Sequence, residues 1–372
     1  MSGDRIAAAT ALWRDGQRDE AISLFRMAAL SSGDAFAHHL HGEAAELSAR
    51  DVEAAAAYRR ALALDPGFNQ ARARLGTCLL RSGDYLDGWR HYEARLFAPG
   101  FSTILALRDR PRWSLRSRPG RRVLVHGEQG RGDSIFLARY VPLLAELGAR
   151  TMVFVQPELE RLFARLPGVS TLLRNGQAMP EFDEQVPLAS LPGTLGTTMS
   201  TIPDAVPYLS PPDDVVDRWR RRLAGPGRSV GLVWSGNTAY DQNDRRSLPL
   251  SGLLTSLGRD RHRLFALQVG PPAGETKGTS VAPLASELSD FVETAGAILA
   301  LDAVVTVDTS VANLAGALGV PACVLLHDAP DWRWGLSGDR TPWYPTLRLF
   351  RQRRPGDWSD PVGAVSRALA EL

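Results

Sequence analysis

An internal repeat near the start of the chain limits the folds available to it more than any other feature does. Small and aromatic residues recur there, since Gly42 returns as Gly76 and Tyr58 returns as Tyr92, in each case 34 positions later. A unit of that length holds two helices and a turn, and it cannot bury its apolar face alone. Successive units must therefore stack, so we predict an α-helical solenoid in this part of the chain.

The residues at fixed places in the unit indicate which repeat this is. Ala54 aligns with Gly88 at the same spacing, an earlier copy sets Ala21 against Ala54, and Pro66 closes the middle unit. Small residues are needed where two helices cross closely, and an aromatic ring fills the gap beside them. The pattern is typical of the tetratricopeptide repeat (TPR). Residues 1–97 hold about three units, which is the lower limit for a stable stack.

The overall composition excludes several classes of protein. The 372 residues are 44% hydrophobic and 23% charged, and the net charge is only +2, as in ordinary globular proteins. Such a charge produces no field that would require nucleic acid or an anionic membrane as a partner. No apolar stretch approaches a membrane span, and the N-terminus lacks an apolar signal core. Cys78 and Cys323 lie far apart, which excludes a disulfide framework, so we expect a reducing, cytoplasmic location.

Strand and helix patterns alternate after a connector rich in proline and arginine at residues 98–120. The first array has strands at 121–126 and 151–156 and helices at 134–147 and 158–166. The second has strands at 230–234, 263–269, 303–307 and 322–326 and helices at 251–257, 291–301 and 310–318. We predict two doubly wound Rossmann-like sheets facing a cleft, at 121–212 and 213–350, and a closing helix within 351–372. Basic clusters at 116–122, 218–222 and 351–354 are interpreted as solvated faces or linkers.

A glycine turn at residues 127–134 joins the first strand of this region to its helix. Such turns form sites in α/β sheets, because glycine lets a ligand approach the backbone and a helix N-terminus favours negative charge. The turn lacks the Gly-Lys-Ser/Thr ending of a P-loop. Its glycines miss the dinucleotide spacing, and Gln156 stands where a carboxylate should accept the ribose hydroxyls. Because Glu158 lies close by, a dinucleotide ligand stays open.

Asp133 is the ionisable group of this turn and stands at the start of the helix. Its carboxylate can serve as an N-cap that accepts backbone N–H groups. Alternatively, it can accept a proton from a hydroxyl nucleophile in the cleft. An ionised aspartate would repel a phosphate at the same helix N-terminus, so we expect phosphate to bind elsewhere.

Two turns of the second array suit a diphosphate. Asp308, Thr309 and Ser310 follow a buried strand and begin a helix whose first N–H groups can bind an anion, although a plain capped helix would look the same. The turn 235–237 leads into a loop at 244–247, whose arginines can pair with a diphosphate in bidentate fashion. Both turns follow strands of one predicted sheet. We therefore predict a diphosphate site at that sheet edge.

Together these motifs resemble a known family. The chain looks like the bacterial TPR proteins with a heptosyltransferase-like domain in the blocks 127–133, 233–237, 244–247, 307–312, 331–334, 342–345 and 348–351. The resemblance implies a GT-B glycosyltransferase related to glycosyltransferase family 9. In that fold the N-terminal sheet binds the acceptor and the C-terminal sheet binds a nucleotide-sugar. The resemblance also implies that neither a metal nor another cofactor is obligatory.

The resemblance assigns roles to residues of this sequence, with Asp133 matching the proposed catalytic base. The donor-binding positions are Ser235, Gly236, Asn237, Arg246, Gln268, Asp308, Thr309, Ser310, Asn313 and Arg333. The acceptor-binding positions are Glu128, Gln129, Gly130 and Gly132. One position departs from the family, because relatives usually carry histidine where this chain has Asn313. Asparagine donates a neutral hydrogen bond but cannot become a cation, so we expect weaker stabilisation of the leaving phosphate or a different donor.

The expected function is transfer of a sugar from a nucleotide-diphosphate donor to an acceptor hydroxyl. Fusion to TPR units suggests that their groove delivers a polypeptide acceptor. The alternative is that the repeats dimerise the enzyme or cap the neighbouring domain. The competing class of function is a non-catalytic TPR adaptor with a degenerate GT-B body, and the asparagine at position 313 is the reason to consider it. A NAD-dependent enzyme is a third possible function.

Two further groups of side chains have a structural and a functional interpretation. His38, His39 and His41 form a cluster that could bind a metal, but the repeat register places His38 and His41 between helices, which favours packing. The tryptophans at 332, 334 and 343 could stack on a sugar or base, but we interpret them as core and interface residues.

Overall fold

The computed structural model describes residues 2–98, 107, 109–240, 242–257 and 262–371, and these form two compact units. The repeat unit contains the described residues up to 98 together with two later segments, Leu195–Thr201 and Asp328–Ser337. The body contains the rest. The repeat unit is therefore built from three separate stretches of sequence, and residues 1–97 alone do not account for it.

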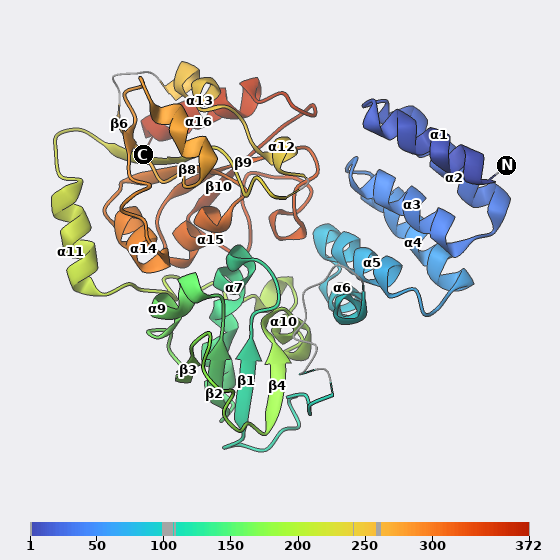
Figure 1. The fold of residues 1–372 in the computed structure, drawn as a ribbon, viewed down its shortest axis with the longest axis horizontal. Helices are drawn as coiled ribbons and strands as arrows, with labels where there is room; N and C mark the ends of the chain where they lie inside the picture. Colours follow the sequence, from blue (N-terminus) through green and yellow to red (C-terminus); the bar gives the residue numbers. More distant parts are fainter. Residues whose placement is uncertain (1, 99–106, 108, 241, 258–261, 372) are drawn as a thin grey trace. The chain divides into compact units, whose positions relative to one another are not determined.

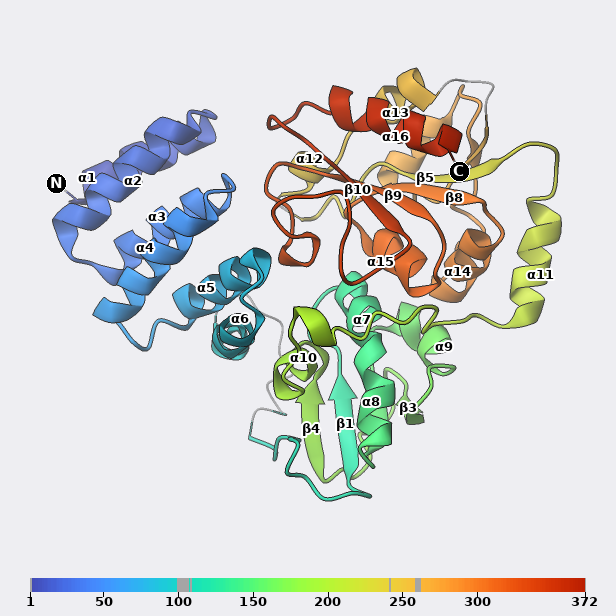
Figure 2. The same cartoon turned by 180° about the vertical axis from the view of Figure 1, so that it is seen from behind.

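Antiparallel helices form the repeat unit, as Figures 1 and 2 show. They are α1 (Ser2–Arg14), α2 (Arg18–Ser32), α3 (Ala35–Glu46), α4 (Asp51–Leu64), α5 (Asn69–Ser82) and α6 (Tyr85–Tyr92), followed by a 3-10 turn at Glu93–Phe97. Each helix packs against the next along the chain. This arrangement of helix pairs confirms the predicted TPR stack.

The glycine and tyrosine that define the repeat contact each other in two successive units. A Cβ atom on Gly42 would lie 2.6 Å from the Tyr58 ring, and one on Gly76 would lie 2.4 Å from the backbone nitrogen of Tyr92. Real Cβ atoms do not approach other atoms so closely, so only glycine allows these helices to cross. The spacing of 34 in the sequence is thus a repeated helix–helix contact.

Aromatic side chains hold the two later segments on the last repeat. Trp332 packs edge-on against Trp89 of α6, with ring centroids 5.2 Å apart. The indole nitrogen of Trp89 also donates a hydrogen bond of 3.0 Å to the Thr197 carbonyl. Trp89 and Trp332 are both buried. The core of the repeat unit therefore includes residues that the sequence interpretation assigned to the sheet domains.

The three histidines of α3 are buried in the repeat unit. The His39 ring lies 4.9 Å from the Phe68 ring and 5.7 Å from the Tyr58 ring, and burial lowers the pKa of His39 to about 4. His41 Nε2 lies 2.8 Å from a carboxylate oxygen of Glu53 on α4. These contacts agree with the predicted packing role.

The first sheet of the body has four parallel strands in the order β3-β2-β1-β4. The strands are β1 (Arg122–His126), β2 (Arg150–Phe154), β3 (Val169–Leu173) and β4 (Glu184–Pro187), and the helices are α7 (Arg131–Leu137), α8 (Val141–Glu146), α9 (Glu160–Phe163) and α10 (Leu191–Thr194). The sequence did not predict β3 or β4. The single helix predicted at 134–147 is wrong, because a 3-10 turn at Ala138–Tyr140 separates α7 from α8, and Pro142 lies in the first turn of α8.

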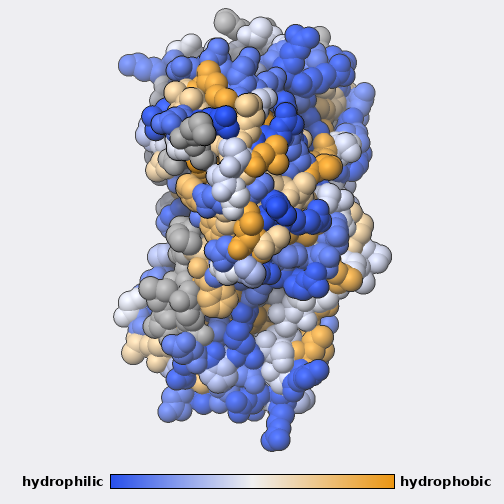
Figure 3. Space-filling model, turned by 90° about the vertical axis from the view of Figure 1, so that its right-hand side faces the viewer, coloured by the Kyte–Doolittle hydropathy of each residue, from blue (hydrophilic) through white to orange (hydrophobic). Residues whose placement is uncertain are grey.

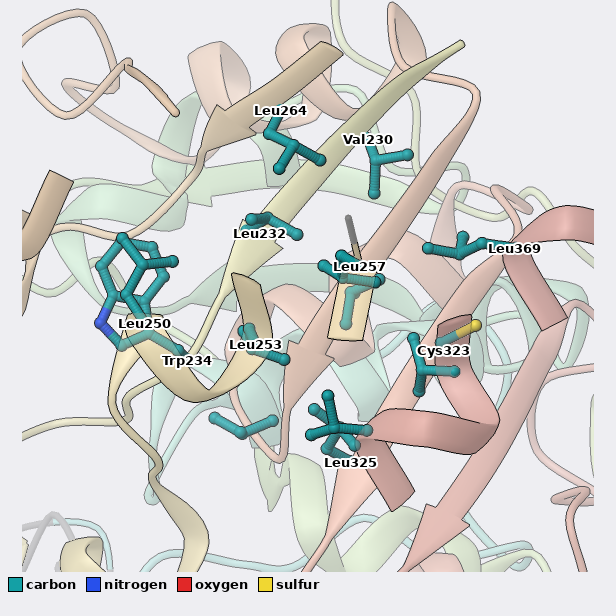
Figure 4. Close-up of a cluster of buried hydrophobic side chains, with 14 of the residues drawn as sticks. Val230, Leu232, Trp234, Leu250, Leu253, Leu257, Leu264, Cys323, Leu325 and Leu369 are labelled. Atoms are coloured by element: carbon teal, nitrogen blue, oxygen red, sulfur yellow. The ribbon is translucent and has the colours of Figure 1, made fainter. Parts of the chain in front are cut away.

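The second sheet has six parallel strands in the order β10-β9-β8-β5-β6-β7. The strands are β5 (Ser229–Val233), β6 (Arg263–Ala266), β7 (Ala282–Pro283), β8 (Ala303–Val307), β9 (Ala322–Leu326) and β10 (Leu347–Arg351), and the helices are α11 (Asp213–Arg222), α12 (Asn243–Arg246), α13 (Leu250–Leu257), α14 (Phe291–Leu299), α15 (Ser310–Ala317) and α16 (Ser359–Glu371). One face is covered by α13 and α16, whose leucines meet those of β5, β6 and β9 in the core drawn in Figure 4. The parallel sheets confirm the predicted α/β body.

One basic cluster has a role that the sequence interpretation missed. Residues 218–222 belong to α11, which packs against α14. Trp219 is buried and donates to Glu293 at 2.9 Å, while Arg218 pairs with the same carboxylate. Arg218 and Trp219 therefore join α11 to α14, while the arginines of this cluster are exposed, as the solvated-face interpretation predicts and the linker interpretation does not.

The exterior shows no dominant apolar region on the face drawn in Figure 3, where hydrophobic side chains lie in small groups among polar ones. Within the described residues, no helix combines the length and the apolar character needed to cross a membrane.

Candidate functional site

The order of the strands marks where a ligand site can form. In the second sheet the chain runs outward from β5 through β6 to β7, then returns to β8 on the other side of β5. In the first sheet the corresponding reversal lies between β1 and β4. Open α/β sheets bind ligands beyond the carboxyl ends of the strands at such switch points. The turns after β1, β5 and β8, which the sequence singled out, all lie at these points.

The glycine turn after β1 is braced by a residue of the neighbouring strand segment. Gln156 donates through Nε2 to the Gln129 carbonyl at 2.6 Å and accepts through Oε1 from the Ser134 hydroxyl at 2.9 Å. A Cβ atom on Gly127 would lie 2.8 Å from the Ser134 oxygen, so this glycine is needed for the close approach. Gln156 thus shapes the turn, which explains why a ribose-binding carboxylate does not stand there.

Asp133 is the third residue of α7, and the N-cap is Gly130. The carboxylate accepts a hydrogen bond of 2.9 Å from the Gly130 N–H, and the Asp133 N–H donates to the Gly130 carbonyl at 3.1 Å. The expectation that Asp133 itself is the N-cap is therefore wrong by three positions, although its carboxylate does serve the helix N-terminus. Asp133 is half-buried. Its role as a base stays a prediction.

Glu158 is the carboxylate for which a dinucleotide ligand stayed a possible interpretation, and in the structure it forms an ion pair with Arg131. The Arg131 guanidinium, at the start of α7, hydrogen-bonds its carboxylate and lowers the pKa of Glu158. Of the predicted acceptor residues, Glu128 is buried and Gly130 is exposed.

The turn after β8 has the geometry of a capped helix N-terminus. Thr309 is the N-cap of α15, and its hydroxyl accepts from the Val311 N–H at 3.2 Å. The same hydroxyl lies 3.1 Å from that of Thr306 on β8. Asp308, Thr309 and Ser310 are all half-buried. The cap fixes the direction of the first N–H groups of α15 beyond the sheet edge.

Arg246 links the turn after β5 to the turn after β8. Its Nη1 donates to the Asp308 carbonyl at 3.2 Å, and its Nε donates to Asn243 Oδ1, also at 3.2 Å. A Cβ atom on Gly236 would lie 2.4 Å from the guanidinium. Asn243 in turn donates to the Ser235 hydroxyl at 3.3 Å. The structure therefore brings Gly236 and Asp308 to the Arg246 guanidinium and links Ser235 to it through Asn243.

Two predicted donor residues make mainly local contacts. Gln268 accepts through Oε1 from the backbone N–H groups of Trp234 and Ser235, at 3.1 and 2.9 Å. Asn237 accepts through Oδ1 from the Ala239 N–H at 3.1 Å. Both side chains hold the turn after β5 in shape. Their contact with a donor stays a prediction.

Arg333 is not brought to this cluster by the structure. It lies in the segment of the repeat unit that carries Trp332, it is buried, and its Nε donates to Asp331 at 2.8 Å. A donor contact by Arg333 also stays a prediction.

The two sheets meet where α7 approaches α15. A Cβ atom on Gly132 would lie 3.2 Å from Asn313 Nδ2 and 3.3 Å from the Ser310 Cα atom. Gly132 therefore allows the first turns of the two helices to touch. Because Asp133 follows Gly132 directly, the predicted acceptor turn and the predicted diphosphate turn lie next to each other within the body.

Sequence reasoning missed several residues around this site. Tyr344 donates through its hydroxyl to Asn313 Oδ1 at 3.1 Å, and Arg139 lies beneath the Tyr344 ring. No spacing rule connects residues so far apart in sequence. Asn243, by contrast, directly precedes the 244–247 loop and could have been included with it.

Comparison with known proteins gives a relative by sequence and, separately, solved structures with a similar fold. No family model matches the chain. Protein FlbA of Caulobacter vibrioides is 28% identical over 377 residues, which cover 91% of this chain and 62% of FlbA. The chain thus spans less than two thirds of that relative.

Solved structures resemble each part of the chain. A family 9 glycosyl transferase from Veillonella parvula matches with a TM-score of 0.51 and 10% identity, over 68% of this chain and 96% of that protein. The Sgt2 TPR domain of Aspergillus fumigatus matches 25% of this chain and 62% of its own length, with 22% identity and a TM-score of 0.24. The body therefore shares its fold with a family 9 glycosyl transferase, and the repeat unit has the helix pairs of a TPR stack.

Proposed function

We propose that the body is a metal-independent GT-B glycosyltransferase that moves a sugar from a nucleotide-diphosphate donor to an acceptor hydroxyl. The contact of Gly132 with Ser310 and Asn313 supports this proposal most directly. It sets a carboxylate beside a helix N-terminus that suits a diphosphate. The fold shared with a family 9 glycosyl transferase is consistent with this chemistry.

In the proposed reaction, Asp133 takes the proton of the acceptor hydroxyl as that oxygen forms a bond to the anomeric carbon. The bond between the anomeric carbon and the diphosphate oxygen breaks, and its electron pair leaves with the nucleoside diphosphate. The N–H groups at Thr309 and Ser310 and the Arg246 guanidinium stabilise the departing charge. The Gly130 N–H donates to a carboxylate oxygen of Asp133 and so holds the proposed base in place at the start of α7.

The repeat unit is proposed to present a polypeptide acceptor to this site. TPR stacks offer a continuous groove along their helices, and the repeat unit forms such a stack. Catalysis in the cytoplasm, where nucleotide-sugars are available, belongs to the same proposal.

The test compares Asp133→Asn with the wild-type chain. Thermal shifts with ADP, GDP, UDP and CDP identify the nucleotide that binds, and mass spectrometry of partner proteins detects the added sugar. We expect Asp133→Asn to lower turnover about 10²- to 10⁴-fold while nucleotide binding is kept. The matched control is Asp290→Asn, which weakens another helix cap, since Asp290 accepts from the Val292 and Glu293 N–H groups of α14.

Two outcomes would contradict the proposal. Full turnover in Asp133→Asn removes this residue from the base role. Absence of stabilisation by any of the four nucleotides favours the second candidate, a TPR adaptor with an inactive body, which the replacement of histidine by Asn313 supports.

A further inference from the structure

Asn313, where this chain departs from the family it resembles, is held by Tyr344, a residue 31 positions later in the sequence. Asn313 lies one turn into α15 and is 2% exposed. Its Oδ1 accepts a hydrogen bond of 3.1 Å from the Tyr344 hydroxyl, and its Nδ2 lies 3.4 Å from the Thr309 carbonyl. Both ends of the amide therefore have partners in the protein.

These partners decide which way the amide faces. The Thr309 carbonyl can only accept, so it requires the NH₂ end of Asn313, and the Tyr344 hydroxyl can donate to the oxygen end. A rotated amide would set two acceptors against each other at Thr309. The NH₂ end consequently lies toward Gly132, whose added Cβ atom would be 3.2 Å from Nδ2. This is the side of α15 that meets Gly132, the residue directly before Asp133.

Tyr344 has little freedom to move away from Asn313. A Cβ atom on Gly316 would lie 2.4 Å from the tyrosine ring, so the ring packs directly on α15. Gly316 and Asn313 are three residues apart and share one face of the helix. The ring also lies over the Arg139 guanidinium, at 4.5 Å.

Arg139 is joined to Tyr344 through the Tyr208 hydroxyl. Its Nη2 donates to the Tyr208 hydroxyl at 3.1 Å, and that hydroxyl lies 3.3 Å from the Tyr344 hydroxyl. A guanidinium only donates and does not lose its proton. The Tyr208 oxygen therefore accepts from Arg139, and its own proton points to Tyr344 or to the Ile135 carbonyl, 3.1 Å away. The Tyr344 hydroxyl in turn donates to Asn313 Oδ1.

We propose that Tyr344 is a positioning residue that holds the Asn313 amide with its NH₂ group toward the leaving diphosphate. Arg139 and Tyr208 anchor Tyr344 in that role. The chain then supplies a fixed neutral donor where relatives supply histidine. This inference rests on the proposed function, because it needs a diphosphate beside α15.

A double-mutant cycle in the full-length protein tests the proposal. The probe is whichever of ADP, GDP, UDP and CDP gives the largest thermal shift, and its Kd is measured by calorimetry at a temperature where every variant is folded. Removal of one hydrogen bond is worth about 1 kcal/mol, or roughly fivefold in affinity. We expect Tyr344→Phe, which keeps the ring, to weaken binding about fivefold, and Asn313→Ala to weaken it at least as much.

The coupling between the two changes separates positioning from general structural support. If Tyr344 acts through Asn313, adding Tyr344→Phe to Asn313→Ala has no further effect on Kd. Tyr85→Phe removes a hydroxyl from a buried tyrosine of the repeat unit and is the control for loss of a buried hydroxyl. We expect its Kd to equal that of the wild type.

Each failure has its own signature. If the wild type binds a nucleotide and Tyr344→Phe binds it with the same Kd, the positioning role is overturned and the proposed function stays intact. Losses that multiply in the double variant, to roughly 25-fold by the same arithmetic, assign Tyr344 a role independent of Asn313 and also overturn it. Absence of any nucleotide binding by the wild type overturns the proposed function, and this inference falls with it.

Discussion

Arg81 in the repeat unit and Arg139 in the body are buried to a similar extent, 8% and 3% exposed, but they are held in opposite ways. Arg81 has two carboxylate partners, Asp51 at 2.9 Å and Glu46 at 3.3 Å. Arg139 donates instead to the carbonyls of Phe136, Pro203 and Trp343 and to the Tyr208 hydroxyl. Among the residues that the structure describes, no carboxylate pairs with Arg139.

The difference shows two roles for a buried arginine: Arg81 joins helices through ion pairs, whereas Arg139 orients neighbouring side chains through hydrogen bonds. In the repeat unit, acid and base neutralise each other, and burial raises the pKa of Asp51 against the opposing effect of Arg81. In the body, dipoles and four aromatic rings surround a cation that keeps its charge. Its hydrogen bonds lead toward Asn313 and the candidate site. The first arrangement joins helices, whereas the second orients a side chain.

The largest effect is expected when Arg81 is removed. Arg81→Met leaves Glu46 and Asp51 as neighbouring buried carboxylates, which should lower the free energy of unfolding by about 3–5 kcal/mol. Urea unfolding followed by far-UV circular dichroism measures the loss. Adding Asp51→Asn to the variant should restore part of the stability. If the double variant is less stable than Arg81→Met, the ion pair is not the reason for the loss.

Removal of Arg139 should cost less stability but should affect binding. Arg139→Met deprives three buried carbonyls of their donor, and we expect a loss of about 3 kcal/mol together with weaker nucleotide binding. Arg139→Lys should recover only part of both, because lysine lacks the planar fork. Urea unfolding and nucleotide titration test the two effects separately. Nucleotide binding at wild-type affinity in a folded Arg139→Met protein would contradict the role of Arg139 in orienting Tyr344 and Asn313.

The strand and helix on either side of the turn at residues 308–310 could be predicted from the sequence. Strands β8 and β9 have the predicted bounds because each is a continuous apolar run that ends at polar residues. The helix α15 begins one residue after its threonine cap. Strand β3 was missed because its sequence, VSTLL, has exposed positions and no clear period.

Contacts between distant residues lay beyond sequence reasoning. The hydrogen bond between Tyr344 and Asn313 joins a loop to a helix, and the packing of Trp332 on Trp89 joins the β9–β10 connection to a repeat. Neither follows from local propensity or periodicity, which describe single elements only. Tertiary packing alone determines these pairs.

Acid should affect stability through the repeat unit. His39 has a pKa of about 4 in the fold and about 6.5 when unfolded, so the unfolded chain binds a proton that the fold excludes. Stability is therefore lost as the pH falls from 6.5 to 4, by about 2 kcal/mol between pH 7 and pH 5. His39→Phe should remove this part of the pH dependence. An identical pH profile in the variant would show that another group is responsible.

The smallest expected effect concerns the cap of the helix to which the Arg139 network leads. Thr309→Ala removes the hydroxyl that accepts from the Val311 N–H and should lower stability by about 1 kcal/mol. Thr309→Ser keeps the hydroxyl and is the control. Thermal unfolding measures both. Equal stability of the alanine variant and the wild type would mean that the cap contributes nothing to α15.

The three-part sequence of the repeat unit has a consequence for synthesis on the ribosome. Trp332 follows Trp89 by 243 positions, so at about 5–20 residues per second the last helix of the stack waits on the order of 10–50 s for its partner. During that interval the indole face of α6 has no covering segment from the β9–β10 connection. Nascent chains of this protein should therefore engage chaperones for most of their elongation, and release should coincide with emergence of residues 328–337.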